Sequence, residues 1–161
     1  KAALKGNPKR FQMPRPLINS GRLDFSFSGL KTAALYAARG VPGPDQLQDT
    51  PPDRVNDLAA GFQEAAVEVL VAKCRLAVRQ MRYSRLCVGG GVAANQSLRD
   101  ELQRMAKKER IELMIAPMAL CTDNAAMAAI AWDLLRAGRI ATLDADVLPG
   151  LVRHAFHRRK T

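Results

Sequence analysis

The chain has 161 residues, of which 48% are apolar and only 5% aromatic. This length suits one domain or part of a larger one, and the apolar share can build an aliphatic core, which excludes a wholly disordered chain. Lysine and arginine number 25 against 15 acidic residues, and the resulting formal net charge of +10 favours polyanionic partners without specifying a fold.

Both ends of the chain are basic. Prolines and glycines are dense over residues 1–22, so this segment is predicted to be an irregular lead-in arm. Residues 141–161 are expected to form a basic tail. This tail holds His154 and His157, the only histidines of the sequence, and neither has an acid or a cysteine nearby. A solvated cationic tail therefore explains these histidines better than a metal site does.

Residues 23–82 are predicted to form a helical subdomain. Ser26 or Ser28 can cap a first helix, and this helix is expected to run to Arg39 because a glycine follows it. The next stretch, residues 41–52, is rich in proline and is predicted to be a loop.

The longest helix is expected after this loop, with Thr50 as its cap and an end near Met81. Its apolar residues recur at the three-and-four spacing of a single helical face. They are Val55, Leu58, Ala59, Phe62, Ala66, Val69, Leu70 and Ala77.

Residues 83–140 are predicted to form an α/β half. Short apolar runs at 84–88 and 111–115 indicate strands, and the amphipathic stretch 95–108 between them indicates a helix. A strand–helix–strand unit of this length implies parallel strands joined by a right-handed crossover.

A glycine-rich turn, Gly89–Gly91, lies between the first of these strands and the helix, which begins at Asn95. Three interpretations are open: a plain tight turn capped by Asn95, a nucleotide or ribose site at the helix start, or a dinucleotide fingerprint. The last needs an acidic residue at the end of the next strand. Glu112 lies at the start of that strand instead, so the dinucleotide pattern fits poorly.

A second polar turn follows the second strand, and in it Thr122 is expected to cap a last helix that ends near Ala137. Asp123 in this turn is either a carboxylate ligand for a metal ion or a residue that favours the helix dipole. In isolation the second interpretation is favoured. Ligands of parallel sheets lie beyond the carboxyl ends of the strands, so both turns are expected at one cleft.

The three cysteines are far apart and form no CxxC pair, which excludes a disulfide scaffold or a zinc ribbon and favours a reducing, intracellular setting. Cys74 and Cys87 are expected to pack in the core. Cys121 is expected beside the cleft. No apolar run approaches the roughly 18 residues of a membrane-spanning helix, so no membrane association is predicted.

Three segments together resemble the TsaD family of tRNA threonylcarbamoyladenosine biosynthesis transferases. They are DFSFSGLKT at 24–32, GGGVAANQSLR at 89–99 and CTDNAAM at 121–127. The resemblance covers roughly residues 7–140. It implies the actin-like, sugar-kinase-like (ASKHA) ATPase fold, with this chain in the C-terminal lobe.

The resemblance also implies the reaction: transfer of a threonylcarbamoyl group from threonylcarbamoyl-AMP to the N6 amine of an adenosine next to the tRNA anticodon. By position, Asn95, Gly90 and Gly91 correspond to substrate-binding residues, and Asp123 corresponds to a ligand of one divalent metal ion, iron or zinc. The implied partners are tRNA and, in bacteria, TsaB- and TsaE-like proteins. The implied location is the bacterial cytoplasm rather than an organelle.

The family's His-x-x-x-His metal motif does not occur in these 161 residues. The chain is therefore predicted to be a C-terminal fragment that is inactive alone, because a metal held by one carboxylate binds poorly. Two other hypotheses are a stand-alone nucleotide- or tRNA-binding module and a Rossmann-like dinucleotide oxidoreductase domain.

Overall fold

The computed structural model describes residues 1–39, 52–124, 128–140 and 142. It divides into two compact units, Lys1–Asp123 and Asn124–Thr161, and each is described by itself. The expected cap at Thr50 and the two histidines of the expected tail lie outside the described residues. The same holds for all of the expected proline-rich loop except its last residue.

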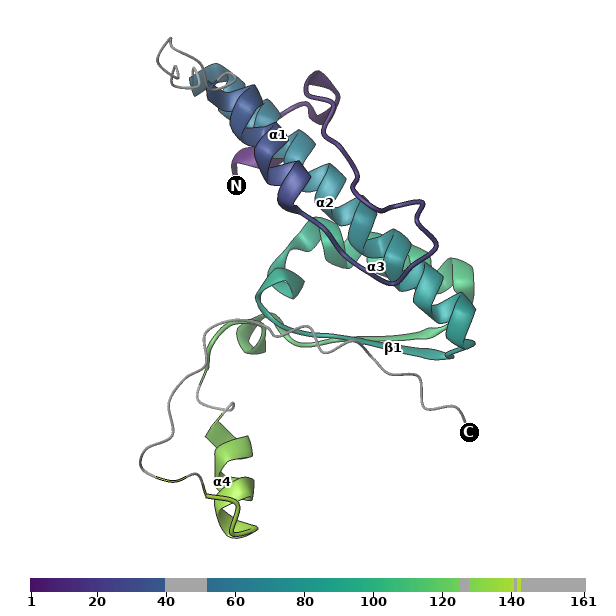
Figure 1. The fold of residues 1–161 in the computed structure, drawn as a ribbon, viewed down its shortest axis with the longest axis vertical. Coiled ribbons are helices and arrows are strands. Elements are labelled where there is room, and N and C mark those ends of the chain that lie inside the picture. The colour runs from purple at the N-terminus through teal and green to yellow at the C-terminus, as the bar shows by residue number, and fades with distance from the viewer. Residues whose placement is uncertain (40–51, 125–127, 141, 143–161) are drawn as a thin grey trace. The chain divides into compact units, whose positions relative to one another are not determined.

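The first unit is built along one long helix, α2 (Pro52–Met81), which ends at the predicted residue. Helix α1 (Ser28–Arg39) also ends as predicted and lies alongside α2 (Figure 1). Arg82 follows α2 with a φ of 53°, in the left-handed conformation that commonly ends a helix.

The burial of α2 is broader than the single face that its apolar spacing predicts. One cluster on α2 packs Ala65 against Leu30 of α1 and Met13 of the arm. A second cluster packs Val67 and Val71 against α3 and the sheet. Small alanine and valine side chains on both sides let α2 lie between two layers. Residues of the predicted face, such as Phe62 and Val69, do pack or are buried, but this face alone does not account for the burial of α2.

The arm is also more ordered than its prolines suggest. Short 3₁₀ helices η1 (Ala2–Lys5) and η2 (Pro8–Arg10) contact α2. The carboxylate of Asp57 on α2 accepts a hydrogen bond from the backbone N–H of Asn7 at 2.7 Å and one from Arg10 at 2.9 Å. The prediction of an irregular arm is therefore wrong for these two segments. Prolines prevent long helices there but do not prevent docking.

A buried lysine fixes the end of the arm. Lys73 on α2 is only 2% exposed. Its ammonium donates to the hydroxyl of Ser20 at 3.0 Å and to the carbonyl of Arg22 at 2.6 Å. These two acceptors offset the cost of removing the charge from water. The helical spacing of apolar residues gave no sign of this contact.

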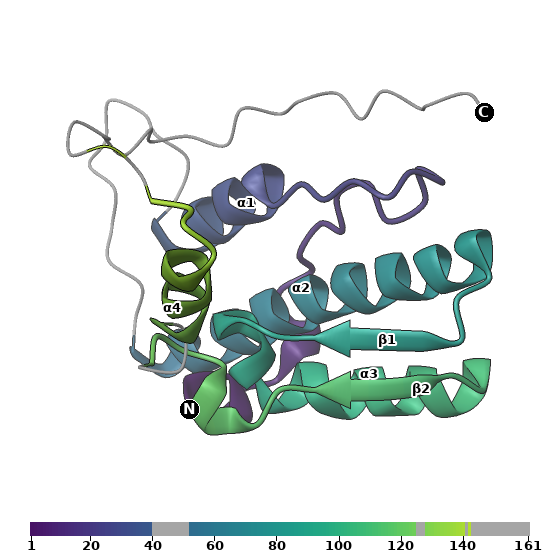
Figure 2. The ribbon, with the colours of Figure 1, turned by 90° about the horizontal axis from the view of Figure 1, so that it is seen from below.

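The predicted strand–helix–strand unit is confirmed. Strands β1 (Arg85–Val88) and β2 (Glu112–Ile115) pair in parallel, with Arg85 opposite Glu112. Figure 2 shows the two strands side by side and pointing the same way, next to α3 (Gln96–Glu109). The apolar face of this amphipathic helix, with Leu98, Leu102 and Met105, is buried.

The cysteines divide differently from the prediction. Cys74 packs against the cluster between α2, α3 and the sheet, and burial raises the pKa of its thiol. Cys87 is exposed. Its neighbours Leu86 and Val88 pack against that cluster, and side chains alternate along a strand, so Cys87 points to the uncovered face of the sheet.

The last helix begins later than predicted. Thr122 and Asp123 lie in a bend rather than in a first helical turn. In the second unit the structure describes α4 as Ala128–Arg136. Across the described ranges, no helix is both long and apolar enough to cross a membrane.

Candidate functional site

The turn after β1 depends on glycine at one position. Gly90 has φ 88° and ψ 171°, a conformation that essentially only glycine adopts. A Cβ added there would meet nothing within 4 Å, so the requirement is conformational and the space above Gly90 is open. Gly91 then begins the 3₁₀ helix η3 (Gly91–Ala94), and both glycines are exposed. A ligand can therefore approach this backbone closely.

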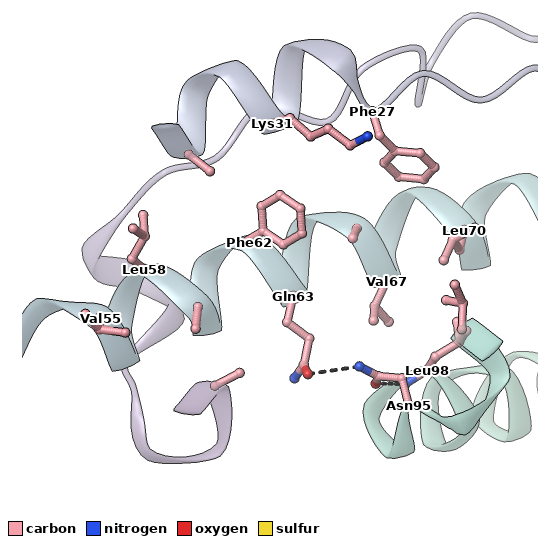
Figure 3. Close-up of a pocket in the computed structure, with 15 residues that line it drawn as sticks. Phe27, Lys31, Val55, Leu58, Phe62, Gln63, Val67, Leu70, Asn95 and Leu98 are labelled. Carbon is pink, nitrogen blue, oxygen red and sulfur yellow. Dashed lines mark hydrogen bonds between the residues drawn. The ribbon is translucent and has the colours of Figure 1, made fainter. Parts of the chain in front are cut away.

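Asn95 links the turn to α3. Its Oδ1 accepts a hydrogen bond from the backbone N–H of Leu98 at 3.0 Å, which confirms it as the cap of α3. Its Nδ2 donates to Oε1 of Gln63 on α2, also at 3.0 Å (Figure 3). A side-chain amide has two N–H donors and an oxygen with two lone pairs, so Asn95 keeps further capacity for a ligand. Its role in substrate binding stays a prediction.

Asn95 also lines a cavity of about 710 Å³ between α1, α2 and the start of α3. The walls are mostly apolar, with Phe27 and Phe62 among them, and the polar groups include Lys31 and Gln63 (Figure 3). Phe27 and Lys31 belong to the first of the three segments on which the resemblance rests, and Asn95 belongs to the second. The fold therefore brings these two segments to one opening, which the sequence did not predict.

The turn after β2 contains Asp123, which is exposed and does not line this cavity. Cys121, two residues earlier, was expected beside the cleft; it is only 1% exposed and does not line this cavity. Glu112 forms an ion pair with Arg85 at 2.7 Å, at the start of β2. Its carboxylate is therefore at the wrong end of the strand for a ribose beyond the sheet.

Arg99 on α3 joins the two turns. Its Nε donates to the carbonyl of Ala93 at 2.6 Å. Its terminal nitrogen donates to the carbonyl of Ala116 at 2.6 Å and contacts Sγ of Cys121 at 3.1 Å. Arg99 therefore holds the two turns close together beyond the carboxyl ends of β1 and β2, whereas the expectation that they face one cleft stays a prediction. Sequence reasoning missed Arg99 as a functional candidate, although it ends the second resemblance segment.

The described residues do not fit a metal centre. Asp123 is a single exposed carboxylate. The sulfur of Cys121 already contacts the Arg99 guanidinium, which is unfavourable for a metal ligand. Within residues 1–39, 52–124, 128–140 and 142, no group of three or more histidine, cysteine or acidic side chains could hold a metal ion.

This geometry defines an α/β protein with a parallel strand–helix–strand unit and a candidate ligand site beyond the strand ends. Comparison with known proteins identifies the family within this class. Residues 1–130 match a family model described as "TsaD: tRNA N6-adenosine threonylcarbamoyltransferase". The chain belongs to the TsaD family, as the resemblance predicted, and membership implies the ASKHA fold.

Curated relatives carry the same description. A tRNA N6-adenosine threonylcarbamoyltransferase of Rhodopirellula baltica is 48% identical over 95% of this chain. Proteins of the same name from Syntrophotalea carbinolica and Chromobacterium violaceum are 43% and 47% identical over 90% and 80% of it. The chain spans only 46%, 41% and 37% of the lengths of these three relatives.

Proposed function

We propose that this chain is the C-terminal lobe of an acyltransferase that moves a threonylcarbamoyl group from threonylcarbamoyl-AMP to the N6 amine of an adenosine next to the tRNA anticodon. The observation that carries this proposal is the match of residues 1–130 to the TsaD family model. Two turns that Arg99 holds together at one rim support it, since substrates of parallel sheets lie at such rims.

In this proposal Gly90, Gly91 and Asn95 bind the adenylate. The open backbone above Gly90 lets a phosphate or ribose approach, and the start of α3 carries partial positive charge that favours an anion. The remaining amide donor and acceptor of Asn95 would orient the bound nucleotide.

The reaction needs the amine nitrogen to attack the carbamoyl carbon, forming a C–N bond while the bond from that carbon to the phosphate oxygen breaks. AMP leaves, and the amine releases one proton to solvent. Holding both reactants in line can supply much of the rate. Asp123 remains a proposed metal ligand, but we derive no step through a metal because the described residues do not fit one. Turnover by this chain alone is expected to be far slower than that of a full-length relative.

The proposed partners are tRNA and TsaB- and TsaE-like proteins, and the proposed location is the bacterial cytoplasm. A stand-alone nucleotide- or tRNA-binding module is the second candidate, and measured AMP or tRNA binding by the chain without turnover would favour it. Family membership leaves the dinucleotide oxidoreductase hypothesis without support.

The test is calorimetric titration of the chain with AMP, comparing Asn95→Asp with the wild-type chain. An aspartate keeps an oxygen for the Leu98 N–H, so the α3 cap survives, but it removes the amide donor and adds a negative charge beside the proposed phosphate site. We expect AMP affinity to fall about tenfold or more.

The control is Asn19→Asp, which makes the same charge change at an exposed residue of the arm. It should leave AMP affinity within about twofold of wild type, as surface charges beyond a Debye length are largely screened. Equal AMP affinity in Asn95→Asp and wild type would contradict the proposed site.

A further inference from the structure

A second hollow, of about 430 Å³, runs between α3 and β2. Its cationic side chains come from α3 and the residue that ends it, and its apolar side chains come from β2 and the residue before it. The residues used in the argument are Arg99, Lys107, Arg110, Ile111, Leu113 and Ile115. We call this hollow the basic groove. No acidic side chain is among the residues that line it.

The basic groove leads to the candidate site. Arg110 and Ile111 mark one end, where β2 begins, and Arg99 and Ile115 mark the other, where β2 reaches the rim. Figure 2 shows α3 running alongside β2 over this distance. In the part of the chain that the structure describes, β2 pairs only with β1, so its other edge borders the groove.

Two of the three cations of the groove are available for a partner, since Arg99 already donates to the carbonyls of Ala93 and Ala116. Lys107 and Arg110 are both exposed, and among the described residues neither side chain forms a hydrogen bond or an ion pair. Arg110 adopts φ 56° and its backbone N–H bonds to the carbonyls of Ala106 and Lys107, so its Cα position is fixed by the end of α3.

The acidic residues of α3 do not neutralise this charge. Glu109 accepts two hydrogen bonds from Arg79 of α2, at 2.8 and 2.7 Å. Glu101 pairs with Arg104 at 2.6 Å. Glu109 and Glu101 are therefore committed to other cations, and Asp100 accepts a hydrogen bond from Gln96 and does not line the groove, which leaves a local excess of positive charge there.

We propose that the basic groove binds phosphates of the tRNA backbone and guides the acceptor adenosine toward the rim. The inference rests on the proposed function. Arg and Lys side chains bind phosphates independently of base sequence, and Lys107 and Arg110 offer such contacts at the end of the groove where β2 begins. No aromatic residue lines it, so base stacking makes no contribution there.

The experiment measures binding of an unmodified tRNA transcript to the full 161-residue chain by fluorescence anisotropy, at salt concentrations from about 50 to 200 mM. The test variant is Lys107→Gln/Arg110→Gln. The matched control is Lys108→Gln/Arg82→Gln, which also removes one lysine from the last turn of α3 and one arginine with positive φ after a helix. Both double variants carry the same net charge.

In the test variant we expect tRNA affinity at low salt to fall about tenfold, and the slope of log affinity against log salt to decrease by about 1.5, because two phosphate contacts are lost. The control should stay within about twofold of wild type with an unchanged slope. Equal losses in the two variants would overturn the groove in favour of a nonspecific charge effect. Absence of tRNA binding by the wild-type chain would also overturn it.

Two further measurements distinguish tRNA from an acidic protein partner, and the groove from the proposed function. Poly-glutamate that binds as tightly as tRNA, with the same loss in the test variant, would overturn the RNA assignment and indicate an acidic protein partner. AMP titration of the wild-type chain tests the proposed function independently. If AMP binds and the groove variants behave alike toward tRNA, the groove fails while the proposed function stands.

Discussion

Arg99 is the side chain through which the candidate site holds its shape. One guanidinium serves Ala93 in the first turn and Ala116 after β2, so the planar fork fixes the separation of the two turns. It touches no reacting atom in this account and is a positioning residue.

Replacing Arg99 tests this role. Arg99→Ala should lower the free energy of unfolding by about 2–4 kcal/mol, because two part-buried carbonyls lose charged donors. It should also weaken AMP binding by more than about tenfold under conditions where the variant is fully folded. Denaturant unfolding and calorimetry give the two values.

Arg99→Lys separates positioning from charge. A lysine keeps the positive charge but lacks the fork that reaches both turns, so AMP affinity should stay close to that of the alanine variant. Wild-type AMP affinity in folded Arg99→Ala would contradict the positioning role, whatever happens to stability.

At the scale of single residues, the sequence predicts the role of a side chain whose partner lies nearby in the chain. Asn95 caps α3 as its type and place before a helix indicate. Arg99 and Lys73 could not be found in that way, because their partners are backbone carbonyls and a hydroxyl that only the fold brings near. Cys87 was misassigned since a strand with an uncovered face exposes every second residue.

At the scale of elements, the arm on α2 shows how charge and pH control docking. The N–H of Asn7 and then the guanidinium of Arg10 lower the pKa of Asp57 below its ordinary value of 3.8. The folded chain therefore binds fewer protons at Asp57 than the unfolded chain does. This contribution to stability is present above that ordinary value and is lost as pH falls through the lowered pKa.

We expect Asp57→Asn to lower stability at neutral pH and to flatten the decline in stability on acidification. The reason is that the neutral amide of the variant does not ionise, so its interaction with Arg10 is weaker and does not change with pH. Urea unfolding of both proteins, from neutral pH to about pH 3, gives the comparison.

Asp100→Asn is the control, since Asp100 is exposed on α3 and its recorded hydrogen bond comes from Gln96 on the same helix. It should keep the wild-type slope of stability against pH. An Asp57→Asn curve parallel to the wild-type curve would show that the arm is not held by this carboxylate.

Element boundaries follow from the sequence to within a residue or two for α1, β1, α3 and β2, because each has a clear period and a local start or stop signal. The two-sided burial of α2 and the docking of the arm do not follow. The spacing of apolar residues indicates only the most apolar face of a helix. Ala65 and Val71 pack into two different clusters, and their small side chains do not mark a second face in the sequence.

At the scale of the whole molecule, the net charge of +10 is consistent with the proposed tRNA partner. Charge alone gives no location for RNA, and motifs alone give no path to the site. The basic groove, which shares Arg99 with the rim, is the proposed path. The sequence could not predict the basic groove, because the groove forms only where α3 packs alongside β2 in the fold.

The most direct test of the account is an NMR titration of the isotope-labelled chain with AMP, following each backbone amide. The account predicts that the largest shifts occur together at Gly90, Gly91 and Asn95 and at Cys121–Asp123, because one nucleotide lies at the rim that both turns form. Shifts confined to one turn, or largest at residues remote from both, would contradict the shared substrate site.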